Sequence, residues 1–391
     1  MKIKITGIRF VLIAFFLFIC LFFPGDPYNL KLLFFFLLCA SSIGAFVSVA
    51  RVRRYSYILI MGIIFPAIIM VWSSVIGGNI YASISEAYCP FLILLTIVIV
   101  VYDIPYEKLL MKLLQWMVVA TLLIIALDLI GIIDVNGNNF IRNSFYAYDM
   151  GIMGKSAAYA AYYKVFFKAS PILLLLLPYC FERNKYGVAI ATFVAIVFSG
   201  TRGNIFVGAV VFFFGFINVW SENKRKKTFR IIIGFFAIIC VIVLIPKIIE
   251  IVVQLMNATG SIGSDLVRNG QLKSFIVLFS NPLKLILGEG FGTQFFDNGR
   301  RMYTTASEIA YFDLLRKIGL VWFSVFIIFV LKPLRFKLGL HNKVAYIGYL
   351  LVCFTNPLLF SSTAYVVYIL FYSKYYEEMY SIKNEKNNKG K

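Results

Sequence analysis

The chain has 391 residues, of which 61% are hydrophobic and only 14% are charged, and its mean hydropathy is +0.86. Soluble domains have an apolar share of about 45–50%, so this composition excludes an ordinary soluble domain. A net charge of +20 would suggest nucleic-acid binding in a soluble protein, but here the basic residues lie in short loops and tails between apolar segments. That pattern follows the positive-inside rule. The sequence therefore predicts a polytopic membrane protein that binds no nucleic acid.

Apolar segments recur along the chain at lengths that suit transmembrane helices, because about 20 helical residues cross the hydrocarbon core of a bilayer. The first follows Lys2 and Lys4 and lacks the small-residue cleavage site of a signal peptide, so it predicts an uncleaved span. The expected spans are 8–24, 30–50, 57–76, 89–102, 113–133, 165–181, 188–200, 204–220, 231–249, 308–331, 344–356 and 361–376. We expect an all-α helix bundle of about twelve spans, forming a single membrane domain over residues 1–391.

The basic loops predict which end of each span is cytoplasmic. Counting from a cytoplasmic N-terminus places every strongly basic short loop on the cytoplasmic side. These segments are 51–54, 107–108, 183–185, 224–227, 332–335 and the basic tail 377–391. Both termini are then cytoplasmic, and two longer polar segments, 134–164 and 250–307, lie on the outer side. Because structureless connections longer than about 12 to 15 residues usually bind something, we expect the functional site on this outer face.

The first candidate site on the outer side is the turn 198–204, which contains Arg202. An arginine at the bilayer centre costs about 2.5 to 3.5 kcal/mol, so one kept at the outer end of a span is a candidate anion ligand. Its guanidinium can hold phosphate oxygens in a bidentate fork, with Thr201 and Asn204 beside it as further substrate-binding candidates. The alternative is an interfacial arginine whose side chain reaches the lipid headgroups.

The large outer segment carries further arginines. Arg268 is a second candidate ligand for an anion, and Arg300 and Arg301 are secondary candidates for binding diphosphate or anionic sugars. The same segment contains the glycine run 288–292. Because the run does not open a helix after a strand and is not followed by Lys-Ser/Thr, it predicts a tight turn rather than a nucleotide-binding loop.

The segment 307–320 leads from this loop into an apolar span and carries four charges, so its helix cannot face lipid all round. Asp313 and Lys317 are one helical turn apart and can neutralise each other. Glu308 has no such neighbour on the helix. We consider it either a general base in a wet cavity or an acid at the helix N-terminus that the macrodipole stabilises. Tyr311 is a candidate substrate-binding residue on the same segment.

Other polar residues give weaker signals. Asp128 lies near the outer end of an apolar span, where pairing with Lys164 or Lys168 would explain it. The only histidine, His341, is in a predicted cytoplasmic loop, and the chain has no Asp-x-Asp pair. The residues therefore predict no metal site and no cofactor. The six cysteines lie in or beside apolar runs and imply no redox role.

Over most of its length the chain resembles the O-antigen polymerase and ligase superfamily. The likeness is carried by the expected spans, the segment 199–203 at an outer span end, a late outer loop with Arg268 and the glycine run, the segment 308–319, and Asn356-Pro357 before the last span.

This resemblance implies an enzyme of the bacterial cytoplasmic (inner) membrane. Such an enzyme transfers glycan from an undecaprenyl-diphosphate-linked oligosaccharide at the outer face without a metal or a nucleotide, alongside a chain-length regulator and a flippase as partners. Ligase relatives have a His-Asn pair where this chain has Glu308, and His341-Asn342 lies on the predicted cytoplasmic side and lacks the glycine. The difference favours a Wzy-type repeat-unit polymerase, which builds O-antigen, capsule or another exopolysaccharide.

On this interpretation, Arg202 and Arg268 stabilise the negative charge of the departing diphosphate. Glu308 takes the proton of the attacking sugar hydroxyl, which typically contributes about a hundred- to ten-thousand-fold in rate. An O-antigen ligase is the alternative within the enzyme class. A polysaccharide-unit flippase or another secondary transporter is the alternative outside it, although the sequence shows no internal repeat.

Overall fold

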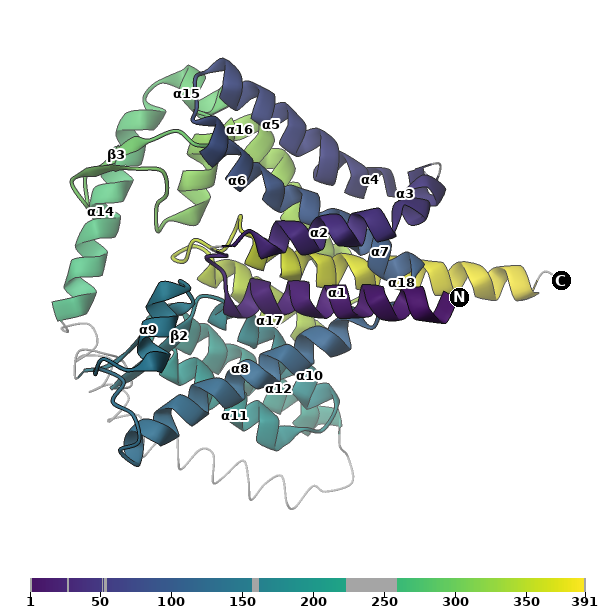
Figure 1. Ribbon diagram of the computed structural model, residues 1–391, viewed down its shortest axis with the longest axis horizontal. Coiled ribbons are helices and arrows are strands. Elements are labelled where there is room, and N and C mark those ends of the chain that lie inside the picture. Colours follow the sequence, from purple (N-terminus) through teal and green to yellow (C-terminus); the bar gives the residue numbers. More distant parts are fainter. Residues whose placement is uncertain are drawn as a thin grey trace. The chain divides into compact units, whose positions relative to one another are not determined.

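A computed structural model of the chain describes residues 2–26, 28–50, 52, 55–156, 162–222 and 259–389. This part of the chain is mostly helical and contains two small antiparallel hairpins (Figure 1). The expected span 231–249 and the basic loop 224–227 lie outside the described residues.

The elements follow one another in chain order with short connections. The first group is α1 (Lys2–Phe22), α2 (Leu30–Ser41), α3 (Ile43–Ala50), α4 (Ser56–Leu59), η2 (Ile60–Ile64), α5 (Phe65–Val75), α6 (Ile80–Phe91), η3 (Leu92–Leu94), α7 (Leu95–Val101) and α8 (Tyr106–Leu129). The second is α9 (Phe140–Ala147), β1 (Gly151–Lys155), β2 (Tyr163–Phe167), η4 (Ser170–Ile172), α10 (Leu173–Glu182), α11 (Tyr186–Phe198) and α12 (Arg202–Glu222). The last is α14 (Thr259–Phe279), α15 (Pro282–Leu287), β3 (Phe295–Asp297), β4 (Met302–Thr304), α16 (Ala310–Leu331), η5 (Lys332–Arg335), α17 (Leu340–Val352) and α18 (Ser362–Lys389).

The chain divides into two compact units, each built from segments distant in sequence. Unit 1 consists of Met1–Leu113, Asn269–Leu338 and Cys353–Lys391, and unit 2 of Leu114–Arg268 and Gly339–Val352.

In unit 1, α1 packs against both α2 and α18, α5 against α6, and α15 against α16 (Figure 1). Several buried tyrosines on and beside α18 donate their hydroxyls to backbone carbonyls, whereas the hydroxyl of Tyr365 has no partner among the described residues. The Tyr372 hydroxyl donates to the carbonyl of Phe329 at 2.9 Å, and the Tyr106 hydroxyl donates to that of Val366 at 3.0 Å. These bonds satisfy polar groups that would otherwise be costly away from water.

In unit 2, α10 is the central helix and packs against α11, α12 and α17. Its residues from Leu173 to Phe181 are all buried, which accounts for its continuous apolar sequence. The hairpin β1–β2 lies beside α9 and pairs Met153 with Val165 in antiparallel register.

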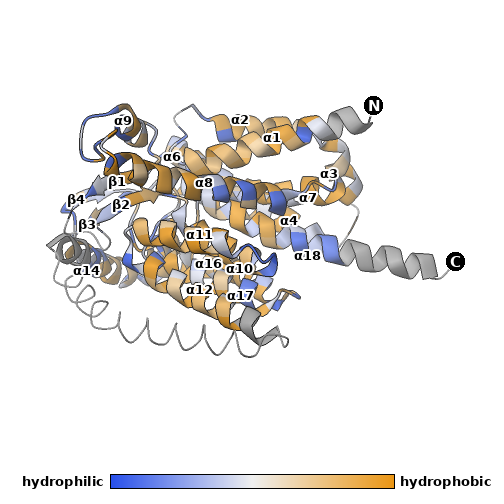
Figure 2. Cartoon of the chain, turned by 90° about the horizontal axis from the view of Figure 1, so that it is seen from below, coloured by the Kyte–Doolittle hydropathy of each residue, from blue (hydrophilic) through white to orange (hydrophobic). Residues whose placement is uncertain are grey.

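Four helical segments of the described chain are long and apolar enough to cross a membrane. They are Ser56–Val75, Ile80–Val101, Tyr106–Leu129 and Ala310–Arg335. The pair α2 and α3, bent by 64°, makes a fifth if it is counted as one broken span. Apolar residues also run along the shorter helices α11 and α12 (Figure 2). The structure is therefore that of a helical protein with several membrane-capable helices, and the number of about twelve spans stays a prediction.

Several of the expected spans begin at the wrong residue, among them the span expected at 113–133, whose helix α8 already begins at Tyr106. The span expected at 89–102 is part of a helical segment that already begins at Ile80, because its polar residues have partners inside the fold: Ser83 Oγ donates to the carbonyl of Phe291 at 2.7 Å. The span expected at 165–181 begins inside β2, since residues 163–167 pair with β1. Helix there starts only at Ser170, with η4.

The two segments expected to be long outer loops contain structure of their own. Residues 134–164 hold α9, β1 and the first residues of β2, and the described part of 250–307 holds α14, α15 and the β3–β4 hairpin. Neither segment is a structureless connection in its described part.

Candidate functional site

Three charged side chains on the first turns of α16 are buried in unit 1. Asp313, Arg316 and Lys317 are all nearly inaccessible to solvent, although the segment Ala310–Arg335 is apolar enough to span a membrane. Buried charges are costly unless they are paired and hydrogen-bonded. Their partners therefore decide what this part of the protein can do.

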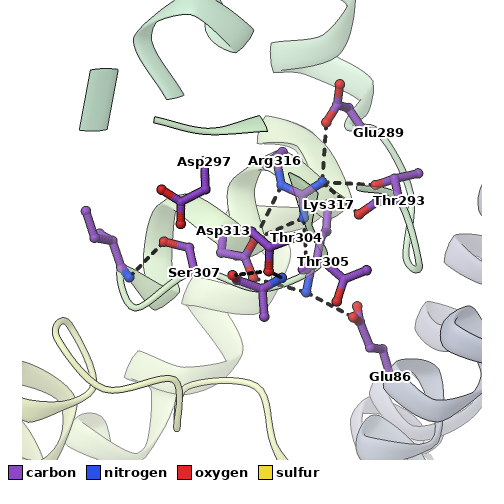
Figure 3. A network of polar contacts seen from close by, with 12 residues as sticks. Glu86, Glu289, Thr293, Asp297, Thr304, Thr305, Ser307, Asp313, Arg316 and Lys317 are labelled. Carbon is purple, nitrogen blue, oxygen red and sulfur yellow. Dashed lines mark hydrogen bonds and ion pairs between the residues drawn. The ribbon is translucent and has the colours of Figure 1, made fainter. Parts of the chain in front are cut away.

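The partners form one continuous chain of ion pairs in which the sign of the charge alternates. Figure 3 shows its members from Glu289 to Glu86. The chain of ion pairs starts at the half-exposed Lys284, whose Nζ lies 2.7 Å from Oε1 of Glu289, and Oε2 of Glu289 lies 3.3 Å from Arg316. Arg316 also holds Oδ1 of Asp313 at 3.0 Å.

The inner end of this chain is the pair of Lys317 and Glu86. Nζ of Lys317 lies 3.0 Å from Oδ2 of Asp313 and 3.0 Å from Oε1 of Glu86 on α6. The structure thus confirms the expected neutralisation of Asp313 by Lys317. Glu86, 231 residues away in sequence, was missed by the sequence analysis. The signal was present, because Glu86 is the only charged residue between Ile80 and Val101.

The glycine run fixes the backbone around these charges. Gly288, Gly290 and Gly292 all have positive φ, so the run forms a turn, as predicted. The N–H groups of Glu289 and Gly290 donate to the carbonyls of Arg316 and Lys317, at 2.7 and 2.8 Å. These two carbonyls are available because α16 is interrupted at Gly319, where φ is 71°. The turn therefore caps the first half of a broken helix.

A pocket of about 200 Å³ opens beside the inner end of the ion-pair chain. Its polar lining comes from Glu86, Ser307, Asp313 and Lys317, and its apolar lining includes Pro357 and Phe360. Convergent charged groups in a partly apolar pocket within membrane-capable helices are the usual signature of a binding or catalytic site.

The β3–β4 hairpin is tied to the edge of this pocket by hydrogen bonds. The buried Asp297 accepts from Gln271 Nε2 at 2.7 Å and from the N–H of Gly299 at 2.8 Å. Gln271 in turn accepts from Ser307 Oγ at 2.8 Å through its Oε1 atom. Phe275 stacks on Phe295 at 5.3 Å between ring centroids, which closes a small apolar cluster behind the hairpin.

Glu308 lies next to Ser307, just before α16. It is neither in the helix nor its cap residue, because α16 begins at Ala310 and Ile309 precedes it. Its Oε1 accepts from Arg300 at 3.1 Å, so the structure brings these two predicted site residues together. Arg301 is exposed at the hairpin turn, and Tyr311 lies with its ring 5.4 Å from that of Phe354.

The other predicted site residues belong to unit 2. Arg202 is exposed at the first position of α12, next to Thr201. Asn204 is buried, and its Nδ2 lies 3.4 Å from Ser199 Oγ. Gly200 has a φ of 67° and packs against Lys164, so this turn needs a glycine. Arg268 lies on α14 and is half-buried.

The partner expected for Asp128 is wrong. Its carboxylate contacts Nζ of Lys155 at 3.1 Å and the Tyr163 hydroxyl at 2.6 Å, rather than Lys164 or Lys168. Lys155 also contacts Asp134 at 3.2 Å. The pKa of Asp134 is lowered by hydrogen bonds that it accepts from the N–H of Asn136 and from Lys155. The pKa of Lys155 is raised by the hydrogen bonds that it donates to Asp128 and Asp134. This cluster ties the hairpin to the end of α8.

His341 and Asn342 have a partner within unit 2. His341 Nε2 and Asn342 Nδ2 both lie 2.6 Å from Oε1 of Glu182, at the end of α10. Through these contacts, the His-Asn pair connects α17 to α10.

No protein-family model, no curated protein and no solved structure matches the chain.

Proposed function

We propose that the protein is a polysaccharide repeat-unit polymerase of the bacterial cytoplasmic membrane. It transfers a growing glycan from undecaprenyl diphosphate to a second lipid-linked unit at the outer face. The proposal rests on the sequence pattern shared with the O-antigen polymerase and ligase superfamily and on the charged pocket in unit 1.

The observation that carries the proposal is the pocket between two membrane-capable helical segments, Ile80–Val101 and Ala310–Arg335. Each segment contributes charge to its wall: Glu86 from the first, Asp313 and Lys317 from the second. A charged residue within a membrane segment is retained at a cost and usually serves a polar substrate or an ion. With the N-terminus inside, the entrance of α16 falls on the outer side, where lipid-linked units are extended.

Three residues carry the chemistry in this proposal. Glu308, held by Arg300, takes the proton of the acceptor hydroxyl, whose oxygen then forms a bond to the anomeric carbon of the donor sugar. The bond from that carbon to the diphosphate oxygen breaks, and its electron pair leaves with the diphosphate. Arg202 and Arg268 stabilise the charge that develops there, the role that cations and metal ions fill in phosphoryl transfer.

A deletion strain tests the class of function. Loss of a polymerase leaves single repeat units on the cell surface, as seen by gel electrophoresis of extracted glycan. Loss of a ligase accumulates long lipid-linked chains, and loss of a flippase traps units on the cytoplasmic leaflet. Either of the last two patterns would replace the proposed function by the corresponding alternative.

Complementation of that strain tests the residues. Arg202→Ala or Glu308→Gln should abolish chain extension while the protein stays in the membrane at wild-type level. Normal long polymer from either variant would remove that residue from the mechanism.

A further inference from the structure

We infer that the pocket lined by Glu86, Ser307, Asp313 and Lys317 is a subsite for one neutral sugar ring of the acceptor glycan, with Glu86 and Lys317 as its hydrogen-bonding residues. This inference rests on the proposed function and adds to it the place where the acceptor binds. Arg202, Arg268 and Glu308 are not needed to define the subsite.

The charge balance of the site decides the class of ligand. Lys284, Arg316 and Lys317 are cationic, and Glu289, Asp313 and Glu86 are anionic, so three positive and three negative groups cancel along the ion-pair chain. A diphosphate or an anionic sugar would require an excess of positive charge. A neutral, hydroxyl-rich ligand requires no excess of positive charge.

The hydrogen-bonding capacity left at the pocket suits hydroxyl groups. An ammonium has three N–H donors, and in the described part of the chain Nζ of Lys317 contacts two carboxylate oxygens, one from Asp313 and one from Glu86. The contact with Lys317 engages Oε1 of Glu86, and among the described residues no hydrogen bond occupies Oε2. One donor and one acceptor therefore remain side by side, which is what a sugar hydroxyl or a pair of vicinal hydroxyls matches.

The size and the apolar wall of the pocket agree with a single ring. Its volume of about 200 Å³ is enough for one sugar ring. Phe360 and Pro357 line the pocket and can cover the C–H face of a sugar. Polar groups that fix the orientation of a ligand beside an aromatic wall are typical of small-molecule sites.

Protection from thiol labelling tests binding directly. Ala306 is exposed and lines the pocket, so an Ala306→Cys variant in a background without the native cysteines should react with a methanethiosulfonate reagent. D-glucose, D-galactose, D-mannose or N-acetyl-D-glucosamine should slow the labelling, and inorganic pyrophosphate should not. Protection by pyrophosphate alone, or by none of these probes, would overturn the inference.

Substitution of Glu86 tests the residue that we assign. In the Ala306→Cys background, Glu86→Gln should raise the half-protecting sugar concentration about tenfold or more, because a hydrogen bond to a charged group is lost. The matched control is Glu107→Gln, because Glu107 also pairs with one lysine, Lys374 at 2.8 Å, and its carboxylate is 28% exposed against 24% for Glu86. Equal protection in both variants would contradict the assignment.

Kinetics with the purified, full-length protein separate this inference from the proposed function. With native lipid-linked repeat units as substrates, Glu86→Gln should raise the acceptor KM about tenfold and change kcat by less than about twofold, as expected for a residue that binds the ground state. If the wild-type protein makes no polymer yet sugars protect the Ala306→Cys variant, the proposed function fails and the subsite stands. If the wild-type protein makes polymer and Glu86→Gln keeps the wild-type acceptor KM, the subsite fails alone.

A second variant covers the case in which Glu86→Gln does not fold. Ala310→Phe fills the pocket without changing a charge, because Ala310 is a buried lining residue. It should raise the acceptor KM at least as strongly as Glu86→Gln, in protein that elutes as a single species from gel filtration. A folded Ala310→Phe variant with the wild-type KM would overturn the inference.

Discussion

Lys317, in the charged first turns of the mainly apolar helix α16, holds its ammonium between the carboxylates of Glu86 and Asp313. Removing the cation leaves two carboxylates facing each other with little solvent, and loss of one partner of a buried ion pair costs about 3 to 5 kcal/mol. We therefore expect Lys317→Met to lower the thermal unfolding midpoint strongly, measured in detergent micelles by intrinsic fluorescence.

Lys374→Met is the control for this prediction, since it removes a lysine whose side chain is 24% exposed and which pairs with the partly exposed Glu107 at 2.8 Å. An ion pair of that kind contributes about 0 to 1 kcal/mol. Equal shifts in the two variants would show that Lys317 is not an essential part of a buried network.

The carboxylates around Lys155 predict that the stability of the 134–164 segment depends on pH. The pKa of Asp134 lies below its usual value of 3.8, first because the N–H of Asn136 donates to it and then because Lys155 does. A carboxyl group whose folded-state pKa is lowered stabilises the fold fully above its unfolded value, and this contribution is lost as the pH falls through the folded value. Asp134→Asn should therefore increase proteolysis of the 134–164 segment at neutral pH, and the difference from wild type should begin to shrink below pH 3.8 and vanish once the pH has fallen through the lower folded-state pKa.

A constant difference between Asp134→Asn and wild type over that whole range would mean that the carboxylate charge is irrelevant. Ser156→Ala, in the same segment but outside the carboxylate cluster, should show no such change with pH.

At this scale, sequence reasoning succeeded where partners are close along the chain. The four-residue spacing of Asp313 and Lys317 was enough to predict their ion pair. Sequence patterns could not identify Glu86 as a partner, because no local pattern indicates that α6 lies beside α16. They also indicated the wrong lysine for Asp128, because the pairing register of β1 and β2 decides which lysine reaches it.

Among the elements, α16 is the one whose geometry the site most depends on. Its break at Gly319 has a φ of 71°, and a Cβ there would lie 2.4 Å from the carbonyl oxygen of Ile286. Gly319→Ala should therefore lower the unfolding midpoint and weaken sugar protection of the pocket, because the clash is with backbone on α15 and not with a movable side chain.

Gly187→Ala is the matched control, since Gly187 lies in helix α11 and a Cβ added there meets no atom within 4 Å. Alanine is favoured over glycine in helices by about 1 kcal/mol, so this variant should be as stable as wild type or more so. A neutral Gly319→Ala variant would show that α16 is not held open by the glycine turn.

Hydropathy windows located most helices but not all of their ends. They found α11 and α16 within two residues, because each helix contains a long apolar run that ends near polar residues. They failed at α6, whose Ser83 and Glu86 are polar but satisfied by distant residues, and at β2, whose alternating burial is invisible to a 20-residue average.

For the molecule as a whole, composition was sufficient to predict a helical protein with membrane-capable helices. The described chain has four such segments, or five with the bent pair. The remaining expected spans that are described correspond to shorter or more polar helices, among them Ser170–Glu182 and Tyr186–Phe198. The number of spans counted from helix length and hydropathy therefore differs from the number predicted from the basic loops. The side of the membrane on which the pocket lies depends on the number predicted from the basic loops.

The claim that the pocket lies at the outer face of the membrane is tested most directly by measuring which end of helix α16 is outside. Its ends are marked by two exposed positions, Ala306 before the segment Ala310–Arg335 and Lys337 after it. In intact cells, a membrane-impermeant maleimide should label the Ala306→Cys variant, and it should label the Lys337→Cys variant only after permeabilisation. Labelling of Lys337→Cys from outside, with Ala306→Cys protected until the membrane is opened, would place the pocket on the cytoplasmic side and contradict an outer-face polymerase.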